Sequence, residues 1–486
     1  MEREVFTNPL RPEALRTGAA LLQSFAADES GAAGRVPSQV IYPQSREDVQ
    51  RIVHEAIRTA TPLVPVSSGP PRFHGDTVPA RGGVIVDFSR MQRVLRIDRA
   101  SRSVRVEPGV TYGELIPQLR AQGLRLSLPF LPRANKSVVA SRLEREPTTI
   151  PKYQYDYMDP LLTLEVVYGT GEDFRTGSAC GPGTLDTLKA DLVNPWGPGS
   201  IDYFRLVSAA QGTMGLVTWA VTKAEILPRL QQLWFLQASD PARLLQPIDA
   251  LLRKRVLDEC VVLNRAALAT MLAGDGMRDY AALARALPAW TALLVVAGYE
   301  RRPEERLALY AKALRDITAA QGVEPGRSVP GAPGREAEIL HLLSNAWTKS
   351  ADWRIRATGS SRELLFIAPM SQVPRLAATV DDVAAQRRIS MQDVPCYIQP
   401  MVQGRGCHCE FVFPRLPTDS AAAMELDALH REAAAQLLRA GAFFSRPYGD
   451  WAQLVYRDYA DGVAALRRLK GVFDPHGLFN PGKLCF

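Results

Sequence analysis

Residues 65–76, which read PVSSGPPRFHGD, are the stretch that decides the fold. The apolar run that leads into it, residues 63–66, predicts a short strand, and a second apolar run begins at Val84. A loop of small residues between two strands can present consecutive backbone N–H groups, which form a nest able to hold a pyrophosphate. Loops of this composition are also common on protein surfaces, so the neighbouring segments decide what this loop does.

Short strands and single helices follow one another on both sides of the loop. Ser45 is placed to cap a helix over residues 49–59, whose apolar residues follow helical spacing. Short apolar runs separated by turns continue to about Pro228, and this mixture indicates an α+β domain. From Arg229 to about Gly441 strands alternate with longer helices, which predicts an α/β layer on an antiparallel sheet. We therefore expect a lead-in (1–35), a first domain (36–228), a second domain (229–440) and a returning tail (441–486).

The size and composition of the chain indicate a globular protein with two domains. Its 486 residues exceed the roughly 250–300 at which a single core stops growing. The net charge of +7 comes from scattered basic residues, so we expect no nucleic-acid partner. Six cysteines and a start without a secretory pattern predict a cytoplasmic location. The longest apolar runs, such as Ala292–Tyr299, are too short to span a membrane.

Motifs of several common enzyme classes are absent. The sequence has no G-x-G-x-x-G after a strand, no phosphate-binding G-x-x-x-x-G-K-[ST], no H-E-x-x-H and no G-x-S-x-G. The trio Cys407-His408-Cys409 contains metal-ligand residue types. Neighbouring residues of a strand point to opposite faces, so the three side chains cannot converge on one ion without a bulge. We therefore predict no metal site.

Four further segments give the loop its context: VEPGVTYGEL (106–115), LEVVYGTGE (164–172), QGTMGLVT (211–218) and DPHGLFNPGK (474–483). In this order and at these separations, they resemble the FAD-binding domain of the p-cresol methylhydroxylase / vanillyl-alcohol oxidase superfamily. The resemblance covers residues 36–228 and the tail, and the middle region loosely. It implies an α+β protein with a two-lobed FAD-binding domain of this type and an α/β substrate (cap) domain on an antiparallel sheet.

The resemblance also implies where FAD lies. Its pyrophosphate would sit on the loop, its adenine side against residues 212–217, and the tail would close over the flavin. Two donors are missing from the loop, because Pro70 and Pro71 have no N–H, and Arg72 could compensate with a bond to phosphate. The expected cofactor-binding residues are Pro65, Ser67, Ser68, Gly69, His74, Gly75, Asp76, Gly212, Thr213, Gly215, Val217, Asn480 and Lys483. Whether FAD is covalently bound stays open, with Cys407, His408 and His74 as candidate attachment points.

Two residues carry the chemistry that the resemblance implies. Asp156 matches the carboxylate that phenol-oxidising members hold near the flavin N5, where it can accept the substrate hydroxyl proton; capping of a turn is the alternative. Arg446 matches the arginine of a Tyr-Arg pair that stabilises phenolate, although Ser445 stands at the tyrosine. Tyr448 or Tyr155 could supply the missing hydroxyl.

The predicted function is that of an FAD-dependent oxidoreductase acting on a small aromatic (phenolic or benzylic) alcohol or C–H group, with hydride transfer to flavin N5. Tyr397 and Trp451 would help to shape the pocket. One alternative is a D-2-hydroxy-acid dehydrogenase of the same fold, with Arg446, Arg354 or Arg356 on the carboxylate. Another is a non-catalytic flavin-fold subunit. The electron acceptor stays open among oxygen, quinone and cytochrome, and the family suggests a c-type cytochrome subunit or a homodimer as partners.

Overall fold

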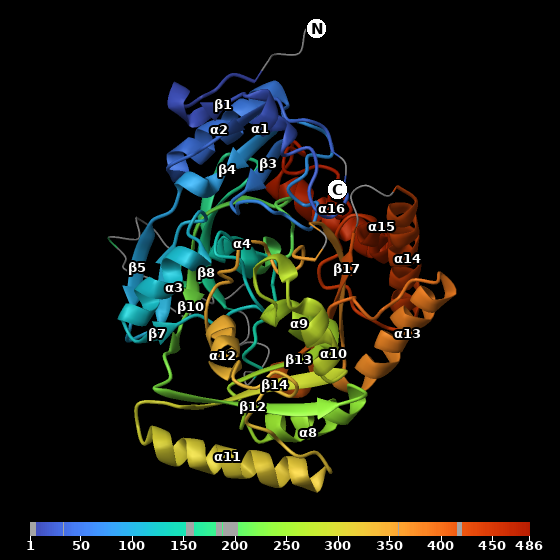
Figure 1. The fold of residues 1–486 in the computed structure, drawn as a ribbon. Helices are drawn as coiled ribbons and strands as arrows, with labels where there is room; N and C mark the ends of the chain where they lie inside the picture. Colours follow the sequence, from blue (N-terminus) through green and yellow to red (C-terminus); the bar gives the residue numbers. More distant parts are fainter. Residues whose placement is uncertain are drawn as a thin grey trace.

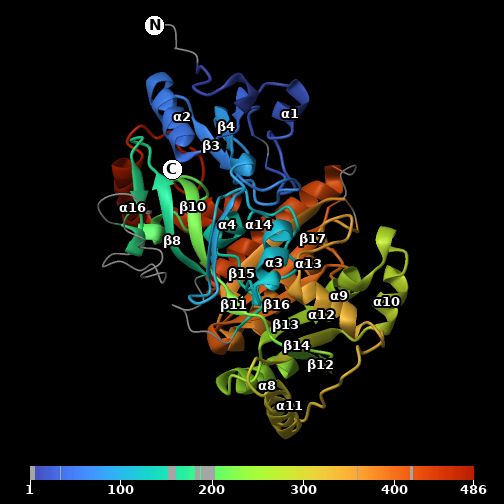
Figure 2. The same ribbon diagram turned by 90° about the vertical axis from the view of Figure 1, so that its left-hand side faces the viewer.

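The computed structural model describes residues 6–32, 34–151, 160–180, 187, 203–357, 359–415 and 420–486. The N-terminal part of the chain forms one lobe and the middle part a second lobe, and the C-terminal tail returns to the first (Figures 1 and 2). Helices and strands are mixed in both lobes. The predicted α+β class is therefore confirmed.

Two small sheets build the first lobe. The cofactor loop, defined as residues 67–76, leaves the end of a strand in the parallel part of the first sheet, where β2 and β3 both pair with β4. The second sheet is antiparallel throughout. The first sheet has the order β1 (Leu15–Arg16), β2 (Gln39–Ile41), β4 (Val84–Asp87), β3 (Leu63–Val66), and the second β5 (Val94–Asp98), β6 (Ser103–Val106), β10 (Leu216–Lys223), β8 (Leu161–Val167), β9 (Asp173–Arg175).

Helices of the first lobe begin at the caps that the sequence provides. The Ser45 side chain accepts from the Asp48 N–H, and Thr111 forms a capping box with Glu114. The apolar side of the first of these helices buries Val49, Ile52 and Val53, as the helical spacing predicts. The remaining elements of this lobe are α1 (Ala19–Gln23), α2 (Arg46–Thr59), α3 (Tyr112–Ala121), α4 (Val138–Leu143) and the small pair β7 (Leu124–Arg125) with β11 (Glu225–Ile226).

One antiparallel sheet carries the second lobe. Its order is β12 (Leu230–Ala238), β14 (Trp290–Gly298), β13 (Glu259–Asn264), β16 (Cys396–Met401), β17 (Gly406–Pro414), β15 (Ser361–Ala368). Apolar residues of α8 (Ala242–Arg253), α11 (Pro303–Ala320), α13 (Val373–Gln386) and α14 (Ser420–Arg439) pack on one face of it. Residues of α9 (Arg265–Leu272), α10 (Tyr280–Ala286) and α12 (Glu336–Ser344) pack on the other. The predicted antiparallel cap sheet is thus confirmed.

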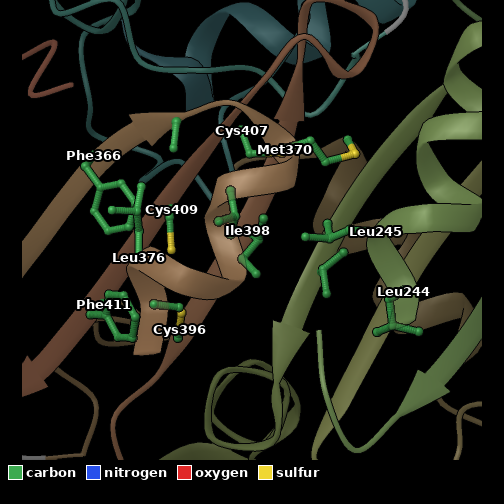
Figure 3. Packing of buried hydrophobic residues seen from close by; sticks show 14 of the residues in the cluster. Leu244, Leu245, Phe366, Met370, Leu376, Cys396, Ile398, Cys407, Cys409 and Phe411 are labelled. Atoms are coloured by element: carbon green, nitrogen blue, oxygen red, sulfur yellow. The ribbon is translucent and has the colours of Figure 1, made fainter. Parts of the chain in front are cut away.

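The strand β17 shows why its cysteines and histidine separate. Cys407 and Cys409 point into the core below the sheet, where Figure 3 shows them among buried apolar side chains such as Leu376 and Phe411. His408 and Glu410 lie on the opposite face of the strand. The alternation predicted from the sequence is confirmed, and no group of metal-ligating side chains occurs among the described residues.

The tail places its last residues beside the first sheet. After α15 (Asp450–Arg457) and α16 (Ala460–Phe473), Phe479 forms a parallel bridge with Leu63 of β3. The Leu63 N–H donates to the Leu478 carbonyl at 2.9 Å, and the Asn480 N–H donates to the Leu63 carbonyl at 2.9 Å. The tail therefore extends the sheet edge from which the cofactor loop departs. No helix in the described ranges is long and apolar enough to cross a bilayer.

Candidate active site

A deep cavity lies where the cofactor loop, the second lobe and the tail meet. It encloses about 1470 Å³ of space, its open mouth included. Its walls come from the cofactor loop, residues 129–147, residues 207–217, three cap strands and residues 446–448 of the tail.

The cofactor loop is fixed by hydrogen bonds between side chains and the main chain that join it to residues 133–137. The Asn135 amide donates to the Pro70 carbonyl at 2.7 Å, the Arg133 guanidinium donates to the Pro71 carbonyl, and the Ser137 N–H donates to the Ser68 hydroxyl at 3.0 Å. These contacts hold one side of the loop. Of the predicted cofactor residues in this region, Pro65, Ser67, Ser68, His74 and Asp76 line the cavity.

Two expectations about individual loop residues need adjustment. The Gly75 N–H already donates to the Asp28 carboxylate at 2.6 Å, so it is not a free nest donor. The Arg72 guanidinium donates to the Ser24 carbonyl at 3.0 Å and lies over the Phe25 ring. Arg72 lines the cavity, but its charge is shared with these contacts. Compensation by Arg72 for the donors lost at the two prolines stays a prediction.

The segment 211–217 approaches β3 and β8 closely enough to require glycine. A Cβ on Gly212 would lie 2.3 Å from the Pro65 Cγ, and the φ of Gly212 is +69°. A Cβ on Gly215 would lie 2.4 Å from the Val166 Cγ2. Both contacts are shorter than carbon atoms allow, so larger residues would push the segment away from β3 and β8.

The tail locks these two segments together. The Asn480 amide donates to the carbonyls of Asp76 and Gln211, each at 2.7 Å. The Lys483 ammonium donates to the Gly75 carbonyl at 2.6 Å. The cofactor loop, the segment at Gln211 and the tail thus meet at Asn480. The Asn480 side-chain oxygen is a buried acceptor that no described residue uses.

Charged side chains form the other end of the cavity. Arg354 contacts Glu363 of β15 at 2.9 Å and Glu410 of β17 at 3.2 Å. Burial raises the pKa of Glu410, but Arg354 and His408 outweigh it and hold the pKa below its usual range. Tyr397 of β16 donates to the same carboxylate at 2.7 Å. This part of the site is a buried, ionised cluster on the cap sheet.

The cluster continues into the first lobe. His74 lies 3.3 Å from Glu363 and 3.8 Å from Glu144, the residue that ends α4. Lys136 contacts Glu144 at 2.6 Å and Glu146 at 3.9 Å. Burial raises the pKa of Glu146, but Lys136 and Arg446 outweigh it and lower the pKa to about 2. Alternating charges therefore run without a break from the cap sheet to the cofactor loop.

Arg446 differs from every other cation of this cluster. Its side chain is buried and lines the cavity, yet no described residue forms a hydrogen bond or an ion pair with it, and its Nε is buried without a partner. Burial lowers the pKa of Arg446, but Tyr448, Glu146 and Glu410 outweigh it and raise the pKa. The guanidinium is thus charged, enclosed and, among the described residues, without a hydrogen-bond or ion-pair partner.

Other predicted residues lie at varied distances from the cavity. Tyr397 and Tyr448 line it. Cys407 faces the cap core, and His408 is fully buried behind the Tyr397–Glu410 pair. Trp451 stacks on His430 in the cap core, and Arg356 donates to carbonyls of Thr270 and Gly274. Asp156 and Tyr155 lie outside the described residues, so their roles stay predictions.

The sequence analysis missed the acidic half of the cluster. Glu144, Glu146, Glu363 and Glu410 carry no motif, and each lies in a different local context. The sequence did carry a signal for Glu144 and Glu146, because LEREP (143–147) places two carboxylates close together in a loop-rich stretch. In the structure this stretch is largely buried.

Comparison with known proteins agrees with this geometry. Residues 37–177 match the FAD binding domain family, and residues 452–484 match the C-terminal domain of FAD linked oxidases. The glycolate oxidase subunit GlcD of Bacillus subtilis is 23% identical over 461 residues, which cover 92% of this chain and 89% of the relative. The D-lactate dehydrogenase [cytochrome] of Arabidopsis thaliana is 27% identical over 194 residues, or 40% of this chain and 31% of the relative.

Two solved structures share the fold over almost the whole chain. The 4-ethylphenol oxidase from Gulosibacter chungangensis has a TM-score of 0.80 at 20% identity, and the match covers 97% of this chain and 94% of that structure. The p-cresol methylhydroxylase has a TM-score of 0.78 at 18% identity, covering 98% and 95%.

The family matches define a flavoprotein: the chain is an FAD-linked oxidoreductase, and its cofactor is FAD. Its fold is the one seen in 4-ethylphenol oxidase and p-cresol methylhydroxylase. The residues present fit this group, because one cavity is lined by most of the predicted cofactor-binding residues, namely Pro65, Ser67, Ser68, His74, Asp76, Gly212, Gly215 and Val217.

Proposed function

We propose that the enzyme oxidises a small aromatic alcohol or an activated benzylic C–H group, and that Arg446 binds the anionic oxygen of the substrate. The observation that carries this proposal is the buried guanidinium in the cavity wall, which has no hydrogen-bond or ion-pair partner in the part of the chain that the structure describes. Burying a charge without a partner is strongly unfavourable. A site that keeps such a charge is therefore suited to a ligand that brings the missing anion.

Aromatic side chains around Arg446 support an aromatic substrate. Tyr448, Tyr397, Phe130 and Phe73 all line the cavity, and Phe130 lies 4.8 Å from Tyr397 between ring centroids. Rings of this kind pack against a substrate ring edge to face or offset, and they exclude water from the guanidinium. Exclusion of water strengthens the attraction between Arg446 and a phenolate or alkoxide oxygen.

The proton of the substrate hydroxyl needs an acceptor in this site. The resemblance assigns this role to Asp156, and bound FAD supplies the hydride acceptor. Arg446 favours loss of the proton, because a guanidinium stabilises the oxyanion that remains. The chain thus contributes orientation, charge and a base, while the two-electron chemistry belongs to the cofactor.

A D-2-hydroxy acid is the second candidate substrate. A relative that matches 92% of this chain is named a glycolate oxidase subunit, and a guanidinium can bind a carboxylate through two parallel hydrogen bonds. Arg354 is less suited to that role, because Glu363 and Glu410 already occupy it.

Anaerobic bleaching of the bound flavin tests the proposal. The purified enzyme is mixed with a 4-alkylphenol, a benzylic alcohol and a D-2-hydroxy acid, and the oxidised flavin absorbance is followed. Bleaching by an aromatic compound supports the first candidate. Bleaching by the hydroxy acid alone replaces it with the second, and no bleaching by any of them overturns both.

The electron acceptor and the location are part of the same proposal. Two relatives are named as a subunit and as a cytochrome-dependent enzyme, which favours reoxidation by a partner such as a c-type cytochrome subunit. All six cysteines are free, which suits a reducing cytoplasm. A homodimer stays a prediction from the family.

A further inference from the structure

The imidazole of His74 is the point where three distant segments meet. His74 belongs to the cofactor loop, and its side chain is largely buried. Its Nε2 lies 3.3 Å from the Glu363 carboxylate of β15, and its Nδ1 lies 3.8 Å from the Glu144 carboxylate at the end of α4. Its ring stacks face to face on the Tyr448 ring, with centroids 4.3 Å apart and planes 2° apart. The His74 ring thus joins the cofactor loop to the cap strand β15 and to the tail.

A carboxylate beside each ring nitrogen favours the doubly protonated imidazole, since both nitrogens can then donate. Burial lowers the pKa of His74, but Glu363, Glu144 and Asp76 outweigh it and raise the pKa above its ordinary value. A cation that lies flat on a tyrosine ring is also favourable. The charged and titratable groups around His74 are Glu363 and its partner Arg354, Glu144 and its partner Lys136, Asp76 of the same loop, and Tyr448 of the tail.

The tail segment 443–448 is held by backbone hydrogen bonds and by packing of Phe444 and Tyr448 in the cap core. The Phe443 N–H donates to the Ile367 carbonyl at 2.9 Å, and the Ile367 N–H donates to the Phe443 carbonyl at 2.8 Å. The Gln211 amide donates to the Pro447 carbonyl at 2.9 Å. These bonds fix the backbone, whereas the Tyr448 ring is held by its packing in the cap core and by its stack on His74. Arg446 lies between these anchors, so a change at His74 reaches the guanidinium.

We propose that His74 is a positioning residue: its protonated ring joins the cofactor loop to the tail, holds Tyr448 and Arg446 in the substrate end, and loosens that end when it loses its proton. The part of this inference that concerns substrate affinity rests on the proposed function. The part that concerns the joint between loop and tail does not.

Two variants distinguish the contribution of the His74 aromatic ring from that of its N–H donors and charge. His74→Phe keeps an aromatic ring for Tyr448 but loses both N–H donors, and His74→Gln keeps one amide donor but loses the ring. His341→Gln, at an exposed histidine of α12, is the matched control. Amide hydrogen exchange of residues 443–450, corrected for intrinsic rates and read by mass spectrometry, is measured between about pH 5 and pH 8, the range in which histidine titrates.

The wild type should protect residues 443–450 at acidic pH and lose about tenfold of that protection as the pH rises. His74→Phe should show the weaker protection at every pH, and His341→Gln should follow the wild type. Substrate titrations, normalised to bound FAD, should show the same pattern. The half-saturating concentration should rise about tenfold with pH in the wild type and stay high in His74→Phe, the size expected for one charge-assisted hydrogen bond.

Three results would overturn the inference. They are a pH-dependent protection in His74→Phe equal to that of the wild type, a protection that is flat with pH in the wild type, and a wild-type half-saturating concentration in His74→Phe at all pH values. If no substrate bleaches the wild-type flavin, the proposed function fails, and hydrogen exchange alone decides whether His74 holds the joint.

Discussion

The two ends of the cavity are lined by different chemical groups. At the cofactor end, backbone groups are tied by amide and ammonium donors, such as Asn480 to the Asp76 carbonyl, and glycines allow the chains to approach. At the substrate end, charged side chains face one another, and Arg446 alone among those cations has no described partner. A backbone cradle serves a cofactor of constant shape, whereas side-chain charges can be changed one at a time to fit a substrate.

The comparison predicts that changes at one end leave the other end intact. The largest effect is expected at Asp156, which the resemblance places at the substrate end. Asp156→Asn keeps the shape of the side chain but removes the base, so flavin reduction should slow by roughly 10²–10⁴-fold. Anaerobic stopped-flow measurements separate this rate from substrate binding, which should change little. Reduction at the wild-type rate would assign Asp156 to structure.

The acidic cluster should make stability depend on pH. The pKa of Glu146 is lowered to about 2 from an ordinary 4.5, so its carboxylate stabilises the fold above about pH 4.5 and loses that contribution as the pH falls towards 2. The contribution is on the order of 3 kcal/mol. In urea unfolding, the free-energy difference between wild type and Glu146→Gln should therefore shrink with acid, and a difference that is constant with pH would contradict this account.

Arg446→Lys tests the substrate end alone. Lysine keeps the charge but not the planar pair of donors, so the half-saturating substrate concentration should rise by the value of a charge-assisted hydrogen bond, about 1.5–3 kcal/mol or roughly ten- to a hundred-fold. FAD content should stay the same. Arg439→Lys, at an exposed position of α14, is the control. A lowered melting temperature with unchanged substrate binding would assign Arg446 to structure.

Asn480→Ala tests the cofactor end, and its effect should be the smallest. The variant loses two hydrogen bonds of 2.7 Å that join the loop to the segment at Gln211. At about 0.5–1.5 kcal/mol each, the loss should weaken FAD binding by about tenfold, as measured by quenching of flavin fluorescence on the apoprotein. Asn345→Ala, at the end of α12, is the control. Unchanged FAD affinity would show that the tail does not close the cofactor end.

The sequence determined the cofactor end because its geometry is local. A loop that folds tightly, or a chain that passes within contact distance of Pro65, requires small residues at fixed positions, and such requirements leave a motif. Gly212, Gly215, Asn480 and the cofactor loop were predicted from the family resemblance of their segments, and in the structure Asn480 joins the cofactor loop at Asp76 to Gln211, next to Gly212. Their contact with FAD stays a prediction. The caps at Ser45 and Thr111 were local in the same sense, and so was the alternation of faces along β17.

Only the tertiary structure decided the substrate end. Glu144, Glu363 and Glu410 lie on three elements in two lobes, and no spacing in the sequence relates them. The role of each charged side chain depends on its ion-pair partner. A buried carboxylate that pairs with an arginine is structural, whereas an arginine without a carboxylate partner can bind a ligand. The sequence could propose Arg446 from its neighbours in the tail, but its freedom follows from the packing of both lobes around it. Charge pairing acts through space, and the order of residues along the chain does not record it.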